Sequence, residues 1–499
     1  MSGAAAAGLA LGVSELAAGL FPSLPSLVEA IANWVIDSVP GPVKDWAISV
    51  FGTADKAVLI IGICVVTVIV GALVGLAARR WFSIAIAAFI AFGALGAFAA
   101  VRDPAVSFAL AVIPAGLAAI TGLAALQWLL GPAPAGAVSE GADASRRRFI
   151  LGLGAVVGMA VVAAGVGRYL VEKGKQVVAG RDQVQLPSPA EAVAPFPSPA
   201  ELDLDDLSPT ITPNADFYRI DTAISVPRVE LPEWTLSFSG MVDSPYSLTY
   251  ADLLEMRMVE RYVTLSCVSN PVGGGLVGNA KWLGVPLSEL LDRAGVGADA
   301  EQIVGRSVDD FTVGFPLEVA YDGRDALIAV GMNDEPLPFE HGFPARLVVA
   351  GLYGYVSATK WISEVELTRW DSFDAYWIPR GWSKEAPVKT QSRIDTPPNG
   401  ARLAAGPRQV AGVAWAPHRG ISRVEVQLGE DVEWVEAELS EALSDNSWRQ
   451  WVVDWDPTPG AYQVRVRATD GEGDTQTDEI VPPAPNGATG WHTVRVQVA

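Results

Sequence analysis

Four uncharged apolar runs constrain this chain more than any other feature, because such segments are stable only in a bilayer or a protein interior. Residues 57–78 form an unbroken run of 22 uncharged residues, which as a helix crosses a hydrocarbon core of ~30 Å. The other runs are 81–101, 104–130 and 149–167, and a weaker candidate near the N-terminus contains Glu15 as its only charge. The sequence therefore predicts a multi-span α-helical membrane anchor over residues 1–170, with helices at 4–21, 57–78, 81–101, 104–130 and 149–170.

A short amphipathic stretch follows the first of these spans. Ser26 and Glu29 have the spacing of a capping box, and Leu27, Ile31 and Trp34 fall on one face of the helix that the box would open. Pro40-Gly41-Pro42 ends the pattern. The stretch is interpreted as an interfacial helix, or as a helix packed against the bundle.

Arginine clusters predict how the anchor is oriented. Arg79 and Arg80 follow the second span, and Arg146-Arg147-Arg148 precedes the fifth. Two intervening spans place both clusters on one side, which the positive-inside rule identifies as the cytoplasm. The protein is thus expected in the cytoplasmic membrane, multi-pass, with everything after about residue 171 on the extracytoplasmic side. Arg168, Lys173 and Lys175 run against this rule.

The second arginine cluster has another interpretation. The run SRRRFI at 145–150 resembles a twin-arginine export signal, which has paired arginines ahead of an apolar stretch. That route exports proteins that are already folded, often around a cofactor. The alternative is that the three arginines act only as a topological stop.

Charge and metal-binding residues are unevenly distributed. Residues 1–178 carry 11 Lys and Arg against 9 Asp and Glu, whereas the remainder carries 24 against 47. An acidic exterior lacks the clustered cations that nucleic acids require. Two cysteines, Cys64 and Cys267, cannot build an iron–sulfur cluster or a Cys-rich zinc site. Since all three histidines follow residue 340 and no CxxCH occurs, no haem is expected either.

The soluble section divides into three parts. Residues 171–212 are Pro-rich and acidic without periodicity, as in a linker. Residues 213–394 mix β-like runs with short helices, which predicts an α+β domain with a mixed sheet. Residues 395–499 show only strand patterns at sandwich spacing, which predicts an immunoglobulin-like β-sandwich.

Cys267, in the soluble section, lies where a functional cysteine could contact a ligand. It ends the β-branched run RYVTLSC and precedes Gly273-Gly274-Gly275, where a backbone without side chains can approach a ligand closely. A lone cysteine is most often a small buried hydrophobe. A functional thiolate at the strand end is the alternative.

Four ordered motifs in residues 205–499 resemble the sulfite oxidase superfamily, which includes sulfite oxidases, assimilatory nitrate reductases and a methionine-sulfoxide reductase. They are Cys267 with GNAKWLGVPL at 278–287, HGFPAR at 341–346, YGYVSATKW at 353–361, and the C-terminal runs GVAW, WRQW and RATD. The resemblance implies a sulfite-oxidase-like molybdopterin domain, and a C-terminal domain of the type through which this family dimerises.

The resemblance also implies a molybdenum–molybdopterin cofactor (Mo-MPT), with Cys267 as the thiolate ligand of the metal and the catalytic residue. Arg346 would donate to the pterin phosphate, since a fixed fork of donors suits that group. The residues implied in cofactor binding are Asn214, Tyr218, Ser307, His341, Arg346, Ala358, Thr359 and Lys360. Taken alone, Arg346 could equally pair with a carboxylate, and His341 could be a core residue.

The departures from the family concern the substrate. Sulfite oxidases have an arginine shortly after the ligand cysteine, where this chain has Pro271 and Val272. Their active-site tyrosine corresponds to Phe311, and their early Arg-Asn-His run corresponds to Ile220-Asp221-Thr222. A pocket without those cations and that phenol would bind sulfite poorly.

The expected function is therefore two-electron, oxo-transfer chemistry on an unidentified substrate outside the membrane. Expected partners are the lipid bilayer, a separate electron carrier or membrane redox partner, and a second copy of the chain as a homodimer. One alternative is a non-enzymatic cell-surface binding module that retains the fold. A third follows from Ser357-Ala358-Thr359-Lys360, which matches the S-x-x-K tetrad of serine acyl-enzymes.

Overall fold

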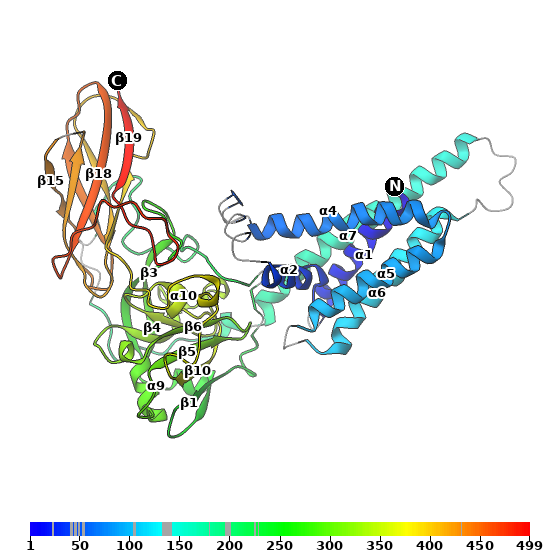
Figure 1. The fold of residues 1–499 in the computed structure, drawn as a ribbon, viewed down its shortest axis with the longest axis horizontal. Helices are drawn as coiled ribbons and strands as arrows, with labels where there is room; N and C mark the ends of the chain where they lie inside the picture. The colour runs from blue at the N-terminus through cyan, green and yellow to red at the C-terminus, as the bar shows by residue number, and fades with distance from the viewer. Residues whose placement is uncertain are drawn as a thin grey trace. The chain divides into compact units, whose positions relative to one another are not determined.

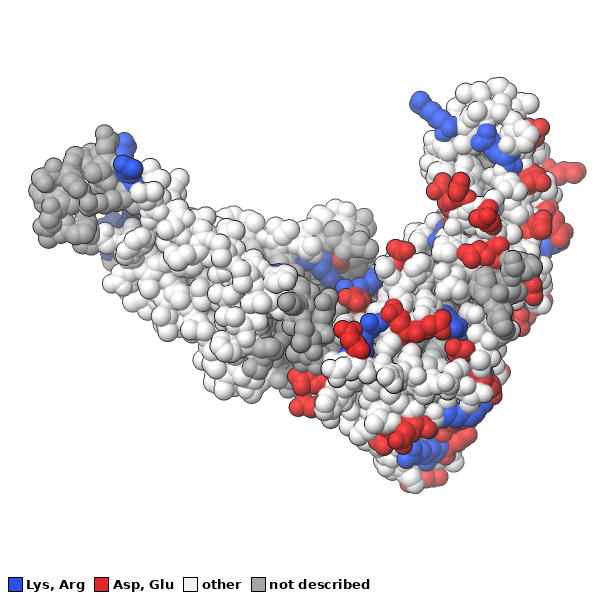
Figure 2. Space-filling view, turned by 180° about the vertical axis from the view of Figure 1, so that it is seen from behind, with Lys and Arg blue, Asp and Glu red and all other residues white. Residues whose placement is uncertain are grey.

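The structure is a computed structural model in which the chain forms two compact units (Figure 1). It describes residues 1–21, 24–39, 43, 47, 50–51, 55–102, 106–131, 142–178, 180–194, 201–223, 226–227, 229–430 and 432–499. The helical unit is Met1–Ala179 with Ala223–Arg228, and the soluble unit is Gly180–Thr222 with Val229–Ala499. On the face drawn in Figure 2, Asp and Glu side chains are spread over the soluble unit, while most of the coloured surface of the helical unit is uncharged.

The helical unit contains the five predicted spans as helices long and apolar enough to cross a membrane. They are α1 (Ser2–Leu20), α4 (Asp55–Ala78), α5 (Phe82–Ala100), α6 (Phe108–Leu130) and, within α7 (Ala142–Val178), the segment Phe149–Val171. Helix α2 (Leu27–Ser38) is the short amphipathic one, and the Ser26 hydroxyl accepts a hydrogen bond from the Glu29 N–H at its start. The run Pro40-Gly41-Pro42 lies outside the described residues.

Helix α1 is the central helix of this unit, which explains why its hydropathy was the weakest. Of its 18-residue apolar window, 56% is buried inside the protein, against 6–33% for the other four helices. It contacts α4, α6 and α7, and glycines at these contacts allow the backbones to approach closely: Gly3 meets Gly71 and Gly75 of α4, and Gly19 meets Gly167 of α7.

A paired polar cluster is buried in the helical unit. The Ser26 hydroxyl donates to a Glu15 carboxylate oxygen at 2.6 Å, and the Arg168 guanidinium forms ion pairs with Glu29 and Glu15. Ionisable side chains in an apolar bundle persist when they are paired in this way. Glu15, the single charge of the first predicted span, is therefore neutralised within the protein.

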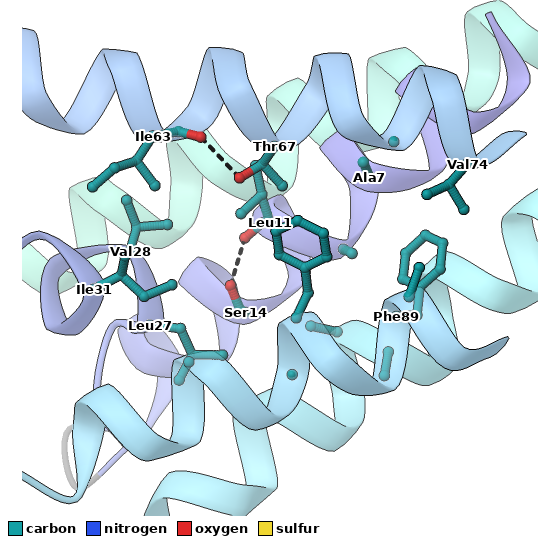
Figure 3. Close-up of a pocket in the computed structure, with 18 residues that line it drawn as sticks. Ala7, Leu11, Ser14, Leu27, Val28, Ile31, Ile63, Thr67, Val74 and Phe89 are labelled. Carbon is teal, nitrogen blue, oxygen red and sulfur yellow. Dashed lines mark hydrogen bonds between the residues drawn. The ribbon is translucent and has the colours of Figure 1, made fainter. Parts of the chain in front are cut away.

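An apolar cavity of about 710 Å³, counted out to its mouth, lies among α1, α2, α4, α5 and α6 (Figure 3). The hydroxyls of Ser14 and Thr67 face it, but each donates to a carbonyl of its own helix, of Leu11 and of Ile63 respectively, at 2.8 Å. The lining therefore offers almost only hydrocarbon.

The soluble unit begins with two sheets that carry short helices. One has the order β2-β1-β10-β5-β6 and the other the order β3-β4-β7-β8, with β9 also paired to β7. The pairing of β1 with β10 is parallel and the others are antiparallel, so the predicted mixed sheet is confirmed. The elements are β1 (Thr235–Gly240), β2 (Tyr246–Thr249), α8 (Tyr250–Leu254), β3 (Val259–Ser266), β4 (Val277–Pro286), α9 (Leu287–Ala294), β5 (Gln302–Ser307), β6 (Thr312–Pro316), β7 (Ala326–Met332), β8 (Glu335–Pro336), β9 (Arg346–Val349), α10 (Gly354–Ser357) and β10 (Ile362–Thr368).

The C-terminal part consists of two sheets around one apolar core. The strands are β11 (Gln391–Thr396), β12 (Arg402–Leu403), β13 (Arg408–Trp415), β14 (Ile421–Leu428), β15 (Trp434–Glu436), β16 (Glu438–Leu439), β17 (Arg449–Trp455), β18 (Gly460–Asp470) and β19 (His492–Val498). Sheet β11-β13-β17-β16 contributes Val410 and Trp451 to the core, and sheet β12-β19-β18-β14-β15 contributes Val424, Val464 and Val494. The all-β prediction is confirmed, whereas the likeness to immunoglobulin domains stays a prediction.

The segment predicted as a linker, 171–212, differs from that description at both ends. Its first residues continue α7 to Val178. Near its other end, the Trp448 indole N–H donates to the Thr210 carbonyl at 2.8 Å, and the Thr212 N–H donates to the Asn279 carbonyl at 2.8 Å. A Pro-rich chain cannot pair as a regular strand, but isolated hydrogen bonds to a neighbouring surface fix it equally well.

Close helix packing yields a first test. Leucine at Gly71 should destabilise the helical unit, because its Cβ alone would lie 2.5 Å from the Ala7 Cβ, and such overpacking costs about 1–3 kcal/mol. The thermal midpoint of the detergent-solubilised protein should fall. Gly62→Leu, on the same helix and with nothing within 4 Å, is the matched control; equal midpoints for the two variants would contradict the packing.

Candidate active site

A pocket of the soluble unit gathers seven of the nine residues that the sequence singled out. Its empty space is about 740 Å³, counted out to its mouth and including open solvent. Its walls come from chain segments far apart in sequence. The lining residues are Phe217, Tyr218, Ile220, Asp221, Thr222, Cys267, Ser307, Asp309, Phe311, His341, Arg346, Gly354, Tyr355, Ala358, Lys360, Trp361 and Trp377.

Cys267 enters the pocket from the end of β3. Its N–H donates to the Leu276 carbonyl at 2.9 Å, and the Asn270 side chain accepts from the Leu276 N–H at 2.8 Å, so the loop between them closes on itself. The side chain is buried, and this burial raises the pKa of the Cys267 thiol. A thiolate here is therefore stable only beside a positive partner such as a metal ion.

The sandwich clamps the glycine loop that follows Cys267. The Arg393 guanidinium donates to the Gly274 carbonyl at 2.9 Å. Gly273 has a φ of +76° and lies against the His492 ring, only 2.2 Å from where a Cβ would stand. His492 is fixed in turn, because its Nδ1 accepts from the Ile394 N–H at 2.9 Å. The position of the cysteine loop thus depends on residues more than 100 positions away.

Arg346 is a buried cation at the start of β9. Its Nη1 donates to the His341 carbonyl at 3.1 Å, and its guanidinium carbon lies 5.1 Å from the centre of the Trp282 ring. Burial lowers the pKa of Arg346 to about 10. Among the described residues no carboxylate forms an ion pair with it. The structure therefore does not support the alternative role of Arg346, which was an ion pair with a carboxylate.

His341 lies between that arginine and the chain segment that leads into the pocket. Its Nε2 is 3.0 Å from the Asn214 carbonyl oxygen. Burial, with the charges of Arg346 and Lys360, lowers the pKa of His341 to about 4, so the ring is neutral at pH 7. Because the Asn214 carbonyl oxygen can only accept, the single N–H of the neutral ring is at Nε2, and Nδ1 remains as an acceptor for a ligand.

Lys360 also lines the pocket, and its side chain is paired with Asp221. The Nζ atom is 2.8 Å from an Asp221 carboxylate oxygen and donates to the Glu340 carbonyl at 3.1 Å. Burial lowers the pKa of Lys360 to about 8, opposed by the Asp221 charge. Arg219 also pairs with Asp221 at 3.0 Å. Sequence reasoning did not assign Asp221 a role, because nothing local marks it as the partner of a lysine 139 positions away.

Two of the predicted cofactor residues do not line the pocket. The Asn214 amide donates to the Met332 carbonyl and accepts from Asn333, so this side chain fixes the segment before Tyr218. Thr359 is fully buried, and its hydroxyl has no hydrogen-bond partner. Residues of the pocket that the sequence did not single out as functional include Asp309, Tyr355, Trp361 and Trp377.

The S-x-x-K interpretation finds no support in this geometry. The Ser357 hydroxyl is fully buried and donates to the Tyr353 carbonyl at 3.0 Å. Lys360, which would have to activate it, is bound to Asp221 instead. A nucleophile needs its base within hydrogen-bond reach.

The donor set fits a molybdenum–molybdopterin cofactor. A buried thiol suits a soft metal ligand, and a buried arginine without a carboxylate partner among the described residues suits a phosphate. Within the part of the chain that the structure describes, no group of three or more His, Cys, Asp or Glu side chains could hold a metal ion. A metal here would thus depend on Cys267 and on ligands that a cofactor brings.

Comparison with known proteins agrees with this assignment. Residues 223–377 match the family described as "Oxidoreductase molybdopterin binding domain". The chain is 28% identical over 339 residues to mitochondrial sulfite oxidase of Mus musculus, covering 58% of this chain and 62% of that protein. It is 30% identical over 310 residues to mitochondrial sulfite oxidase of Drosophila melanogaster, covering 52% of each.

More distant proteins share the same region. An NADH nitrate reductase of Brassica napus is 27% identical over 321 residues, covering 52% of this chain and 35% of that protein. The crystal structure of the sulfane dehydrogenase SoxCD from Paracoccus pantotrophus has the same fold, with a TM-score of 0.52 at 24% identity over 57% of this chain and 81% of that chain. The chain spans roughly half to two thirds of the length of the sulfite oxidases that it matches.

The fold and the pocket define a molybdopterin-binding oxidoreductase domain. The chain carries such a domain of the sulfite oxidase superfamily, as the sequence motifs predicted.

Gly273 provides a test of the clamped loop. Alanine at this position should displace the loop, because its Cβ meets the His492 ring and a left-handed alanine costs about 1–2 kcal/mol. The purified variant should hold less molybdenum than wild type. Gly275→Ala, with nothing within 4 Å of the added carbon, should hold the wild-type amount, and equal loss in both would contradict the clamp.

The buried histidines predict how stability changes with pH. Burial lowers the pKa of His492 to about 4, so the folded chain binds this proton less readily than the unfolded chain does. The stabilisation is complete above about pH 6.5 and falls as the pH decreases towards 4, by up to about 3 kcal/mol. Urea unfolding at pH 7.5 and at pH 5 measures the free energy of unfolding, and its decrease between the two pH values should be smaller for His492→Asn than for wild type. The control is His418→Asn at an exposed position, which should retain the wild-type drop; a full drop in His492→Asn would refute the prediction.

Proposed function

We propose that the protein is a membrane-anchored molybdenum-cofactor oxidoreductase that performs two-electron, oxo-transfer chemistry on a small molecule or a protein side chain. One observation carries the proposal: a buried thiol and a buried arginine without a carboxylate partner line the same pocket. A buried guanidinium is unfavourable without an anion, and a buried thiol ionises only beside a positive partner. One metal-containing, phosphate-bearing ligand would supply both partners.

The residues have distinct roles in this proposal. Cys267 binds the metal, and Arg346 binds the phosphate of the pterin. His341, neutral at pH 7, hydrogen-bonds the pterin, while Tyr218, Ser307 and Ala358 complete the contact surface. The backbone at Thr359 and the Lys360 side chain hold the far end of the pterin. The bound cofactor supplies the two-electron redox chemistry, and the protein contributes orientation, desolvation and hydrogen bonds.

Sulfite is not the substrate that this pocket favours. At the positions where sulfite oxidases have an arginine and a tyrosine, the pocket presents Ile220 and Phe311. An apolar side chain cannot replace the charge-assisted hydrogen bonds that hold an oxyanion. The cofactor end of the pocket is thus retained and the substrate end is altered.

The membrane setting is supported by the helical unit. Five helices have the length and composition of membrane spans, and the positive-inside rule applied to the two arginine clusters favours an extracytoplasmic soluble unit. Arg168 lies on the side opposite to that expected from the positive-inside rule. Its charge is paired with Glu29 and Glu15, so it does not count as a free positive charge. Export of the folded unit through the twin-arginine motif at Arg146-Arg147-Arg148 would allow cofactor loading in the cytoplasm.

Two partners belong to the proposal. A separate electron carrier or membrane redox partner exchanges electrons with the pocket, and the C-terminal domain, which we propose is immunoglobulin-like, joins two copies of the chain as a homodimer. The second candidate function, a cell-surface module without metal, is favoured by the altered substrate end. Retention of Cys267 in a clamped, buried loop speaks against it.

Metal analysis of the purified, exported protein tests the proposed function. We expect about one molybdenum per chain in wild type and almost none in Cys267→Ala, because the thiolate is the one protein ligand of the metal. Cys64→Ala, in helix α4, should retain the metal and serves as the control. Metal-free wild-type protein would disprove the proposal, and redox activity that persists in Cys267→Ala would refute the ligand assignment.

A further inference from the structure

Five aromatic rings form a continuous arc along one side of the pocket. Phe311 and Tyr376 lie 5.5 Å apart between ring centres, Tyr376 and Trp377 5.2 Å, Trp377 and Trp382 6.4 Å, and Trp382 and Tyr355 5.7 Å. Three of these rings, Phe311, Trp377 and Tyr355, line the pocket itself. The arc therefore presents aromatic surface to whatever shares the pocket with the cofactor.

The arc is held in place by polar contacts behind it. The Tyr376 N–H donates to the Thr312 hydroxyl at 3.0 Å, which ties the ring segment to β6. Lys384 donates to the Phe373 carbonyl at 2.8 Å and to Asp374 at 2.9 Å, and so fixes the loop on which three of the rings stand. A rigid aromatic wall loses little conformational entropy when it binds a ligand.

A carboxylate lies at one end of this wall. Asp309 lines the pocket two residues before Phe311, and its Oδ1 accepts from the Phe311 N–H at 3.4 Å. Burial, with the nearby Asp221 charge, raises the pKa of Asp309. No Lys or Arg of the described residues forms an ion pair with Asp309. A cation bound in the pocket would offset the desolvation of this carboxylate.

The other charged groups of the pocket are already committed. Lys360 binds Asp221, Arg346 lies beside Trp282 and is assigned to the cofactor phosphate, and His341 is neutral at pH 7. What faces the substrate is thus a set of aromatic rings, one carboxylate and the apolar Ile220. Aromatic faces combined with a carboxylate recognise organic cations, through the negative potential of the ring faces and direct charge attraction.

We infer that the substrate end of this pocket binds an organic cation, such as a quaternary ammonium or a sulfonium compound, rather than an oxyanion. The inference rests on the proposed function, because it takes the cofactor to occupy the end of the pocket with Cys267 and Arg346. Asp309 acts as the specificity-determining residue, and Phe311, Trp377 and Tyr355 enclose the cationic group.

Ligand-observed NMR titrations of the full-length, molybdenum-loaded protein in detergent test the inference. The probes are choline, its uncharged carbon isostere 3,3-dimethylbutan-1-ol, and sulfite. We expect choline to bind at least about tenfold more tightly than the isostere, because the isostere loses both the carboxylate attraction and the cation–π contact, and we expect sulfite to bind more weakly than choline.

Two matched substitutions localise the binding. Asp309→Asn should weaken choline binding at least about tenfold, whereas Asp310→Asn, at the exposed neighbouring carboxylate, should leave it unchanged. Trp377→Leu provides an independent variant, and it should weaken choline binding without affecting molybdenum content.

The outcomes separate the two proposals. Molybdenum-loaded wild-type protein that prefers sulfite, binds choline and the isostere equally, or binds choline as well after Asp309→Asn would overturn the organic-cation site while the proposed function stands. Wild-type protein without molybdenum would overturn the proposed function itself.

Discussion

Desolvation of two reactive groups, the Cys267 thiol and the Arg346 guanidinium, is the constraint on which the candidate site depends. Both are buried in the same pocket, and burial opposes the charged state of each. A protein that keeps a guanidinium away from water without a carboxylate partner gives up several kcal/mol unless another anion compensates. If the proposed cofactor supplies that anion, cofactor binding is part of the energetics of the fold.

The sandwich contributes to the site as well as to the fold. Arg393 and His492, from β11 and β19, contact the glycine loop that follows Cys267, and Trp448 fixes the segment that leads into the pocket through Thr210. The hydrogen bonds inside the loop close it on itself, and the contacts from the neighbouring domain fix its glycines from outside. Loss of the sandwich would thus disturb the metal ligand, even though no sandwich residue lines the pocket.

The parts of the molecule that could be predicted are those encoded locally. Uncharged runs of about 20 residues define spans because each residue contributes its own transfer free energy, and short motifs such as HGFPAR carried the cofactor assignment. Helix α1 gave the weakest signal because 56% of its apolar window is buried inside the protein, where small and polar residues are tolerated. The contacts of His492 with Gly273 and of Lys360 with Asp221 join positions 219 and 139 apart, and no local pattern specifies such pairs.

The same distinction explains why the sequence identified the cofactor more readily than the substrate. Residues that bind one invariant cofactor must present the same chemical groups in every protein that uses it. Their residue types can therefore be recognised as short motifs. The substrate end that we propose consists of Asp309, Phe311 and the aromatic segment around Trp377, which the fold brings together from separate loops. Each of these residues is unremarkable where it stands in the chain. Only their arrangement in the folded chain suggests a binding site. The aromatic rings line one side of the pocket and Asp309 lies beside them, while Lys360 is paired with Asp221 and Arg346 is assigned to the cofactor phosphate.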